Sequence, residues 1–132
     1  MATEILDVRT TTRIETIDIT ALVRAAVKKA GVQEGLCCVF CPHTTAGLTI
    51  QENADPTVKA DMMQHLSKLI PKEGFTHDEG NSDSHIKSSV VGASTTVLVE
   101  NGRLLLGHWQ AIFFCEFDGP RDRRVHIKVV PG

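Results

Sequence analysis

The sequence has no long hydrophobic run and no strong excess of either charge. No apolar stretch approaches the ~20 residues that a helix needs to cross a bilayer. The first ten residues, MATEILDVRT, also lack the charged start and apolar core of a signal peptide. We therefore expect a cytoplasmic protein that does not enter a membrane. The formal net charge of −2 does not fit a broadly basic nucleic-acid-binding domain, so we expect no nucleic-acid partner.

Common catalytic signatures are also missing. The chain contains no GxxxxGK phosphate loop, no GxSxG and no HExxH. Its 132 residues, 42% of them hydrophobic, have the size and composition of one compact globular domain, residues 1–132. Any active site must therefore be inferred from less specific combinations of polar residues.

The four cysteines do not form a convincing metal or disulfide pattern. Cys38 and Cys41 have the C-x-x-C spacing that can indicate metal or redox chemistry. They lie in GLCCVFC, however, an apolar run typical of a buried strand, in which residues three apart point to opposite faces. We therefore interpret all four, including Cys37 and Cys115, as small buried hydrophobic residues.

Apolar periodicity predicts an α+β fold with a largely antiparallel sheet, two main helices and one short helix. We expect segments 4–10 and 13–19 to form an antiparallel hairpin. Further strands are expected at 35–41, 46–52, 94–107, 108–117 and 124–130, and helices at 18–31, 55–71 and 85–92. Asp55 is expected to cap the second helix, whose buried stripe would be Val58, Met62, Leu66 and Leu69. The dipeptide Asn101-Gly102 predicts a two-residue hairpin turn.

Histidines near a long polar segment suggest a metal site. Residues 72–84, KEGFTHDEGNSDS, are typical of a functional loop, and His77 and His85 lie in or directly after it. With His43 they could supply three imidazoles to a divalent metal, zinc or magnesium, with an open coordination position. Three acidic residues could orient the rings: Asp78, Glu79 and Asp83. The alternative is that these are surface histidines in a mobile loop.

Other polar residues suggest a site for an anion. Ser82, Asp83 or Ser84 could cap the following helix, whose first backbone N–H groups would favour an anion, and Asn81 could add a hydrogen bond. Arg121 follows Asp118 in FDGPR and could grip phosphate oxygens. The alternatives are a solvated helix cap and an ordinary tight turn.

Three further positions are candidates. Thr44 and Thr45 follow His43 between two predicted strands, so we expect them at the edge of the sheet beside the site. Trp109, the only tryptophan, stands next to Gln110 and is either a core anchor or a flat wall for a heteroaromatic ring. Glu52, at a predicted strand-to-helix junction, could act in acid–base chemistry or hold Mg²⁺.

Three long stretches resemble motifs of a known family: CPHTTAGLTIQENADP, FTHDEGNSDSHIKSS and LLLGHWQAIFFCEFDGPR. They look like the YjbQ family, small proteins described as secondary thiamine-phosphate synthases, over about residues 37 to 130. The resemblance implies a sandwich-like antiparallel α+β fold and assembly as a homotrimer. It also implies transfer of a hydroxymethylpyrimidine group from its pyrophosphate to a thiazole phosphate, with release of pyrophosphate.

The resemblance also implies a set of site residues for a small phosphorylated metabolite. His43, His77 and His85 fall on family motifs, and Mg²⁺ and Arg121 would suit the charge of a departing diphosphate. The expected catalytic residues are His43, Glu52, His85 and Arg121. The expected substrate contacts are Thr44, Thr45, Asn81, Ser82, Trp109, Gln110, Asp118 and Arg121.

Two alternatives to this activity remain open at the sequence level. One is a metal-dependent hydrolase, or another enzyme of phosphorylated metabolites, at the same histidines. The other is a non-catalytic module that binds a metal or a metabolite. The chain also departs from the family at His108, where a threonine often precedes the Trp-Gln pair, so this residue is either a substitute ligand or a surface change.

Overall fold

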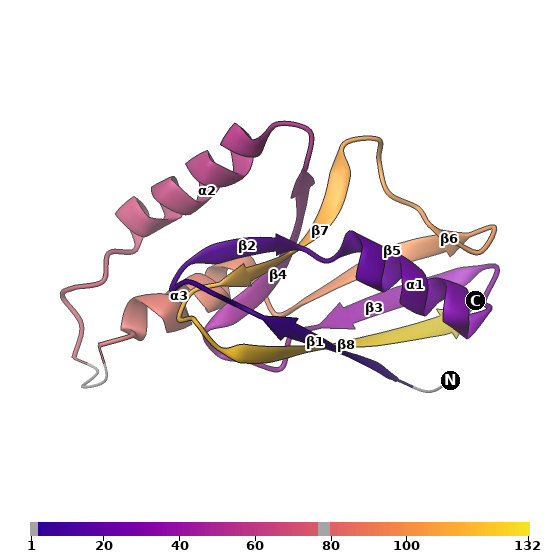
Figure 1. Cartoon of the computed structure of the whole chain (residues 1–132), viewed down its shortest axis with the longest axis horizontal. Coiled ribbons are helices and arrows are strands. Elements are labelled where there is room, and N and C mark those ends of the chain that lie inside the picture. The colour runs from indigo at the N-terminus through magenta and orange to yellow at the C-terminus, as the bar shows by residue number, and fades with distance from the viewer. Residues whose placement is uncertain (1–2, 77–79) are drawn as a thin grey trace.

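Two antiparallel β-sheets form the framework of the protein (Figure 1). The structure, a computed structural model, describes residues 3–76 and 80–132. One sheet has the strand order β1-β8-β3-β5-β6 and the other the order β2-β7-β4. The strands are β1 (Glu4–Arg9), β2 (Glu15–Asp18), β3 (Gly35–Phe40), β4 (Ala46–Glu52), β5 (Ser94–Glu100), β6 (Arg103–Leu104), β7 (Gln110–Glu116) and β8 (Asp122–Pro131). The helices are α1 (Thr20–Ala30), α2 (Pro56–Leu69) and α3 (Ser82–Val91).

This architecture confirms the predicted α+β fold, and several local signals act as expected. Asp55 Oδ1 accepts a hydrogen bond from the backbone N–H of Thr57 at 2.9 Å, capping α2. Gly31 ends α1 in the left-handed conformation, at φ 69°. Asn101 and Gly102 have φ of 52° and 76° in the turn between β5 and β6, as a primed hairpin turn requires.

The predicted hairpin of segments 4–10 and 13–19 is wrong. β1 pairs with β8, whereas β2 pairs with β7 in the other sheet. Between them the chain crosses from one sheet to the other and holds the loop after β7: Thr10 N donates to Arg121 O, and Gly119 N to Arg13 O, both at 3.0 Å. A strand has the same alternation of apolar residues whether its partner is near or far along the chain, so the pattern could not identify the partner strand.

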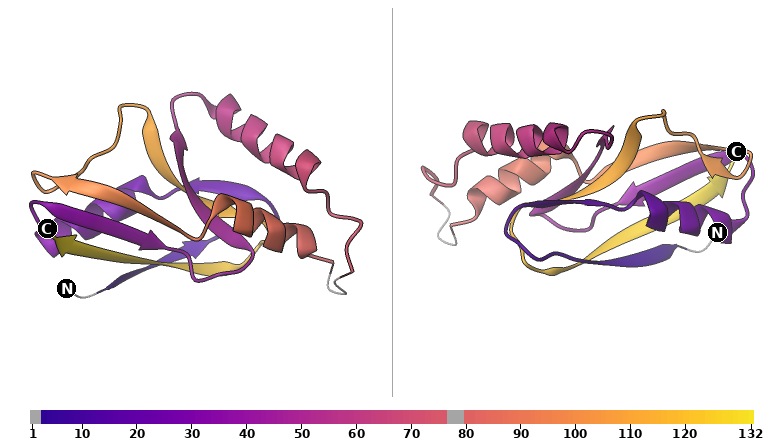
Figure 2. Two further views of the ribbon diagram at one scale, coloured as in Figure 1. Left: turned by 180° about the vertical axis from the view of Figure 1, so that it is seen from behind. Right: turned by 45° about the horizontal axis from the view of Figure 1, so that its top comes forward.

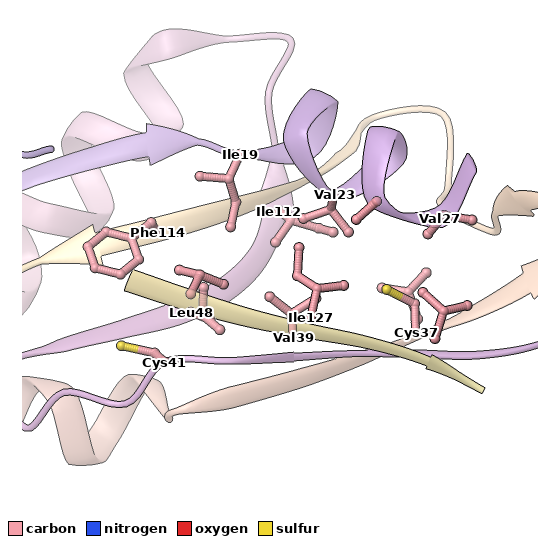
Figure 3. Close-up of a cluster of buried hydrophobic side chains, with 14 of the residues drawn as sticks. Ile19, Val23, Val27, Cys37, Val39, Cys41, Leu48, Ile112, Phe114 and Ile127 are labelled. Carbon is pink, nitrogen blue, oxygen red and sulfur yellow. The ribbon is translucent and has the colours of Figure 1, made fainter. Parts of the chain in front are cut away.

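The main core lies between the two sheets and α1 (Figure 3). Its labelled members come from both sheets and from α1: Ile19, Val23, Val27, Cys37, Val39, Cys41, Leu48, Ile112, Phe114 and Ile127. Strand β7 is buried on both faces, because Phe113 and Cys115 form a second cluster that Met63 and Leu66 of α2 cover. The smaller sheet therefore lies between the main core and helix α2.

Three of the four cysteines are buried as predicted, but Cys38 is exposed. The alternation of β3 that turns Cys37 inward turns Cys38 outward, so treating all four as buried was wrong. Burial raises the pKa of the Cys37 thiol to about 11 and that of Cys115 to about 12. Both are therefore protonated packing residues at neutral pH.

Helix α2 is only loosely covered. It lies with α3 at one end of the molecule (Figure 2), and none of its fourteen residues, all of which the structure describes, is fully buried. Leu69, predicted to belong to the buried stripe, is 72% exposed, while Leu66 packs against the second cluster. Among the helices that the structure describes, none is long and apolar enough to span a bilayer.

Candidate functional site

The loop between β7 and β8 forms one wall of the candidate site. It contains a cis peptide bond between Gly119 and Pro120. A Cβ atom at Gly119 would lie 2.2 Å from the carbonyl oxygen of Thr12, so only glycine fits this position. Arg121 folds back on the loop, its Nε donating to the Asp118 carbonyl oxygen at 2.8 Å and its Nη2 to Asp118 Oδ2 at 3.0 Å. The guanidinium is thereby held beside a carboxylate at the surface.

Asn81 joins this loop to the start of α3. Its Nδ2 donates to Asp118 Oδ2 at 2.9 Å, so the carboxylate accepts from both Asn81 and Arg121. Burial acts to raise the pKa of Asp118, but these hydrogen bonds and the charges of Arg121 and Arg13 outweigh it and lower the pKa. In the part of the chain that the structure describes, Asn81 Oδ1 is buried without a hydrogen-bond partner, which leaves an acceptor for a ligand.

The first turn of α3 lines an open cavity of about 430 Å³. Ser82 and His85, three residues apart and so on one helix face, border it together with Phe75 and Ile86. The helix begins three residues earlier than predicted. Its N-cap is Asn81, without a side-chain capping bond, and not one of the predicted capping residues. The backbone N–H groups at this helix start are suited to an anion.

A buried ion cluster fixes α3 against the sheets. Asp83 is fully buried, and its carboxylate accepts from Lys87 Nζ at 3.0 Å and from Arg13 Nη2 at 3.1 Å. Burial acts to raise the pKa of Asp83, but the hydrogen bonds and charges of Lys87 and Arg13 lower it. Ser84 Oγ donates to the Phe117 carbonyl oxygen at 2.5 Å. Asp83 therefore anchors the helix. It was predicted to orient a histidine ring, but no described contact joins it to one.

A second buried cluster of charged residues holds the loop between β7 and β8 in place. Glu116 is 0% exposed and Arg123 is 5% exposed, and they form an ion pair. Thr10 Oγ1 donates to Glu116 Oε1 at 2.7 Å, and the backbone N–H of Asp118 donates to Glu116 Oε2 at 3.1 Å. Arg123 Nη2 donates to Thr45 Oγ1 at 2.8 Å. Thr45, expected to contact substrate, is buried and its hydroxyl is engaged in this cluster.

Sequence reasoning missed Glu116 and its pairing with Arg123, an arginine that the sequence suggests only as part of a basic cluster for a phosphorylated metabolite. The available signal was a charged residue inside each of two apolar strands, at IFFCEF and RRVHI. Buried charges are normally paired, so a charge at an inward strand position implies a partner of opposite charge.

His43 lies at the edge of the larger sheet beside β8, as expected for a residue that follows β3. Its Nε2 accepts a hydrogen bond from the backbone N–H of Arg124 at 3.0 Å, so in the neutral ring the proton is on Nδ1. Burial and the positive charge of Arg123 lower the pKa of His43. At neutral pH this ring therefore offers one N–H donor, Nδ1–H, and the neighbouring Thr44 is exposed.

The predicted three-histidine metal site cannot be assembled from the described residues. His77, Asp78 and Glu79 lie outside them. Among residues 3–76 and 80–132, no three side chains of histidine, cysteine, aspartate or glutamate group closely enough to hold a metal. His43 could bind a metal only through Nδ1 while its bond to Arg124 persists. The metal therefore stays a prediction.

The remaining predicted residues lie at the opposite end of the smaller sheet. Glu52 is the register partner of Gln110 at the far ends of β4 and β7. Trp109 is 59% exposed, which contradicts the core alternative, and its ring stands edge-on to that of His108 at 4.4 Å between centroids. These rings border a cavity of about 310 Å³ together with Asn53.

One chain therefore does not bring all the predicted residues together. Glu52 and Thr45 are separated by the length of β4, roughly 20 Å at 3.3 Å per residue. We call the two groups the Arg121 end and the Trp109 end. The Arg121 end comprises Asn81, Ser82, His85, Asp118 and Arg121. The Trp109 end comprises Glu52, His108, Trp109 and Gln110.

Comparison with known proteins identifies the family of the chain. Residues 4–132 match the family model described as UPF0047 protein YjbQ-like. UPF0047 protein YugU of Bacillus subtilis is 54% identical over 127 residues, covering 95% of this chain and 96% of that protein. UPF0047 protein MJ1081 of Methanocaldococcus jannaschii is 52% identical over 124 residues, covering 93% and 90%.

Solved structures agree with the sequence relatives. An uncharacterized YjbQ/UPF0047 family protein of Clostridium acetobutylicum superposes with a TM-score of 0.95 at 52% identity, covering 96% of this chain and 99% of that one. A hypothetical protein of Aeropyrum pernix K1 superposes with a TM-score of 0.94 at 32% identity and full coverage of both chains. The sequence match, the shared fold and the motifs around His43, Asn81 and Arg121 lead to one conclusion: the chain belongs to the YjbQ-like UPF0047 family.

Proposed function

We propose that the protein is a transferase that makes thiamine phosphate from a hydroxymethylpyrimidine pyrophosphate and a thiazole phosphate. The proposal rests on the motifs shared with the YjbQ family and on the anion-binding chemistry of the Arg121 end. In the reaction, the bond from the methylene carbon to the pyrophosphate oxygen breaks while a bond to the thiazole nitrogen forms. The pyrophosphate takes the electron pair, and no proton is transferred. A catalyst must therefore stabilise negative charge on the leaving pyrophosphate.

The observation that carries the proposal is the fixed guanidinium of Arg121. Its Nε and Nη2 are engaged by Asp118, while Nη1 makes no hydrogen bond within the described part of the chain. The group is thus oriented before a ligand arrives, with N–H donors left for phosphate oxygens. The helix start at Ser82 adds backbone donors of the type that binds a diphosphate, and His85 borders the same cavity.

A direct assay tests the transferase. The purified chain is incubated with both substrates and Mg²⁺, and thiamine phosphate is measured by oxidation to its fluorescent thiochrome. Arg121→Gln should lower kcat/KM by roughly 100-fold, the usual cost of one transition-state donor. Arg9→Gln is the matched control, because Arg9 is an exposed arginine paired with Asp122 and should leave kcat/KM unchanged.

The outcomes separate the proposal from its alternatives. Product formation that is the same in Arg121→Gln and the parent would contradict the role of Arg121. Release of phosphate or pyrophosphate without thiazole phosphate would support a hydrolase, and chelation would then test the predicted metal. Ligand binding without any turnover would support a binding module.

We also propose that the chain assembles as a homotrimer. The outer face of the larger sheet is not covered by a described element of this chain and carries exposed apolar side chains: Ile5, Leu36, Phe40, Leu98 and Val130. An exposed apolar face of this kind favours association. Light scattering on the eluting protein should give three times the chain mass of 14.4 kDa, and Leu36→Lys should lower it. A monomeric mass for the parent chain would contradict the trimer.

A further inference from the structure

A third cavity lies at the other end of the molecule from Arg121. It has a volume of about 650 Å³ and opens between the C-terminal half of α1 and the turn that joins β5 to β6. Figure 1 shows α1 and β6 side by side, with α3 at the opposite end. The proposed transferase chemistry does not use this cavity. Of its lining residues only Leu104 belongs to a family-like motif and only Arg24 also borders the Trp109 cavity, so it needs an explanation of its own.

Three positive side chains border the cavity. Arg24 and Lys28 are four residues apart and share a face of α1, and Arg103 approaches from β6. In the described part of the chain, none of the three forms an ion pair, and no acidic residue lines the cavity. Glu100 is the register partner of Arg103, but the two side chains form no ion pair. Glu100 borders a neighbouring cavity instead. The cavity therefore has three positive side chains at its rim, while one carboxylate, that of Glu34, lies close by and accepts from the backbone N–H of Asn101 at 3.1 Å.

The floor of the cavity is apolar and its wall is fixed. Val27 and Val32 are buried, and Leu104 is partly buried. The backbone N–H of Gly102 donates to Gln33 O at 3.0 Å, which ties the β5–β6 turn to the segment after α1. A ligand would thus meet a preformed surface, with cations at the rim and hydrocarbon beneath, which suits an anion attached to an apolar body.

We propose that this cavity binds a small phosphate monoester whose organic part is apolar. Two or three cations can share the phosphate oxygens through charge-assisted hydrogen bonds, while the organic part rests on the valine and leucine floor. The site is separate from the Arg121 end, and its existence does not depend on the transferase activity.

Phenyl phosphate is the probe, followed by amide chemical shifts in the ¹⁵N-labelled full chain. We expect the largest shifts at the backbone amides of Gly31, Gln33 and Gly102, which line the cavity. The double variant Lys28→Gln/Arg103→Gln should raise Kd by about tenfold or more, since each lost charge-assisted bond weakens binding severalfold. Added salt should weaken binding to the parent chain as well.

Lys29→Gln is the matched control for charge. Lys29 is the neighbour of Lys28 on α1, but its Nζ lies 3.3 Å from Glu4 Oε1 and it does not line the cavity. Its Kd should stay within about twofold of the parent, because an exposed ion pair elsewhere contributes little. The amide spectrum of each variant shows whether it is folded, and the single variants replace the double one if it is not.

Several results would overturn the site. These are an absence of shifts at the three amides, shifts confined to the region of Asn81 and Asp118, or equal weakening by Lys29→Gln and the double variant. Inorganic phosphate tests the apolar floor separately. It should bind more weakly than phenyl phosphate, and equal affinity would show that the floor contributes nothing.

Discussion

At the Arg121 end of the smaller sheet, buried charged residues hold the polar side chains in place. Asp118 accepts from two neighbours, and the backbone beside it is held by Glu116. At the Trp109 end the side chains extend into solvent, with Trp109 paired edge-on to His108. Both ends carry residues from the motifs that resemble the family. Hydrogen bonds such as Asn53 N to Trp109 O at 3.0 Å also hold the Trp109 end, but among the described residues only the Arg121 end is fixed by buried charged groups.

This difference indicates two kinds of surface. A charge held by buried neighbours binds an anion without first losing conformational freedom, which is the property that our proposal of a phosphorylated ligand requires of the Arg121 end. An exposed tryptophan can gain favourable contacts only when another molecule covers it. The Trp109 end is therefore better suited to a surface completed by a ligand or a second chain.

The largest expected effect is on the support of the Arg121 end. Arg123→Met leaves the buried Glu116 carboxylate without its counter-charge, which should lower the free energy of unfolding by about 3–5 kcal/mol. Urea unfolding followed by circular dichroism measures the loss. Arg9→Met breaks an exposed ion pair and should cost less than about 1 kcal/mol. Equal losses from the two variants would contradict the supporting role of the buried pair.

A second effect concerns acid stability. Hydrogen bonds and cations lower the folded-state pKa of Asp83, Glu116 and Asp118 despite their burial. The unfolded state therefore binds more protons than the folded state. The stability that these carboxylates contribute is fully present above their unfolded pKa values, near about 4, and is lost as pH falls through the lower folded values. Unfolding in urea at pH 7, 4 and 3 should show this decline.

The variant Asp118→Asn should flatten this decline between pH 4 and 3. At the other end, Asp55 is fully exposed, and its pKa is lowered by hydrogen bonds from Thr57. Asp55→Asn is the comparison variant and should change the slope less, because solvent screens its interactions. A steeper decline in Asp118→Asn than in the parent would contradict the lowered pKa of Asp118.

A smaller effect is expected at the Trp109 end. Trp109→Ala removes a side chain that is 59% exposed and should cost less than about 1 kcal/mol of unfolding free energy. Phe113→Ala, in the strand β7 that follows Trp109, empties a buried position and should cost about 3–5 kcal/mol. Thermal or urea unfolding compares them. A loss from Trp109→Ala as large as that from Phe113→Ala would mean that Trp109 is covered in solution.

The smallest predicted effect is a proton position. Because Nε2 of His43 accepts from Arg124, the neutral ring should carry its proton on Nδ1. Burial and the charge of Arg123 should hold its pKa below the ordinary value of about 6.5. Imidazole ¹⁵N shifts across a pH titration report both properties. An Nε2–H tautomer would show that the bond to Arg124 is absent in solution, and titration above the ordinary value would contradict the effect of burial and Arg123 on the ring.

Local signals in the sequence predicted much of the fold. The caps and turns at Asp55, Gly31 and Asn101 depend on a few neighbouring residues, so they could be read directly. Strand pairing depends on segments about a hundred residues apart, and the segment from 4 to 19 was therefore assigned the wrong partners. The same limit applies to the candidate site, because motif membership does not give the distance between Glu52 and Arg121.

By itself the sequence determined most of the elements and the candidate groups, because each follows from side-chain chemistry at short spacing. Only the tertiary structure decided which groups meet. It paired Glu116 with Arg123 beneath the loop, bonded Asn81 to Asp118, and placed Trp109 about one strand length away from them. Such pairings depend on how two sheets pack around one core, and no local pattern specifies that packing.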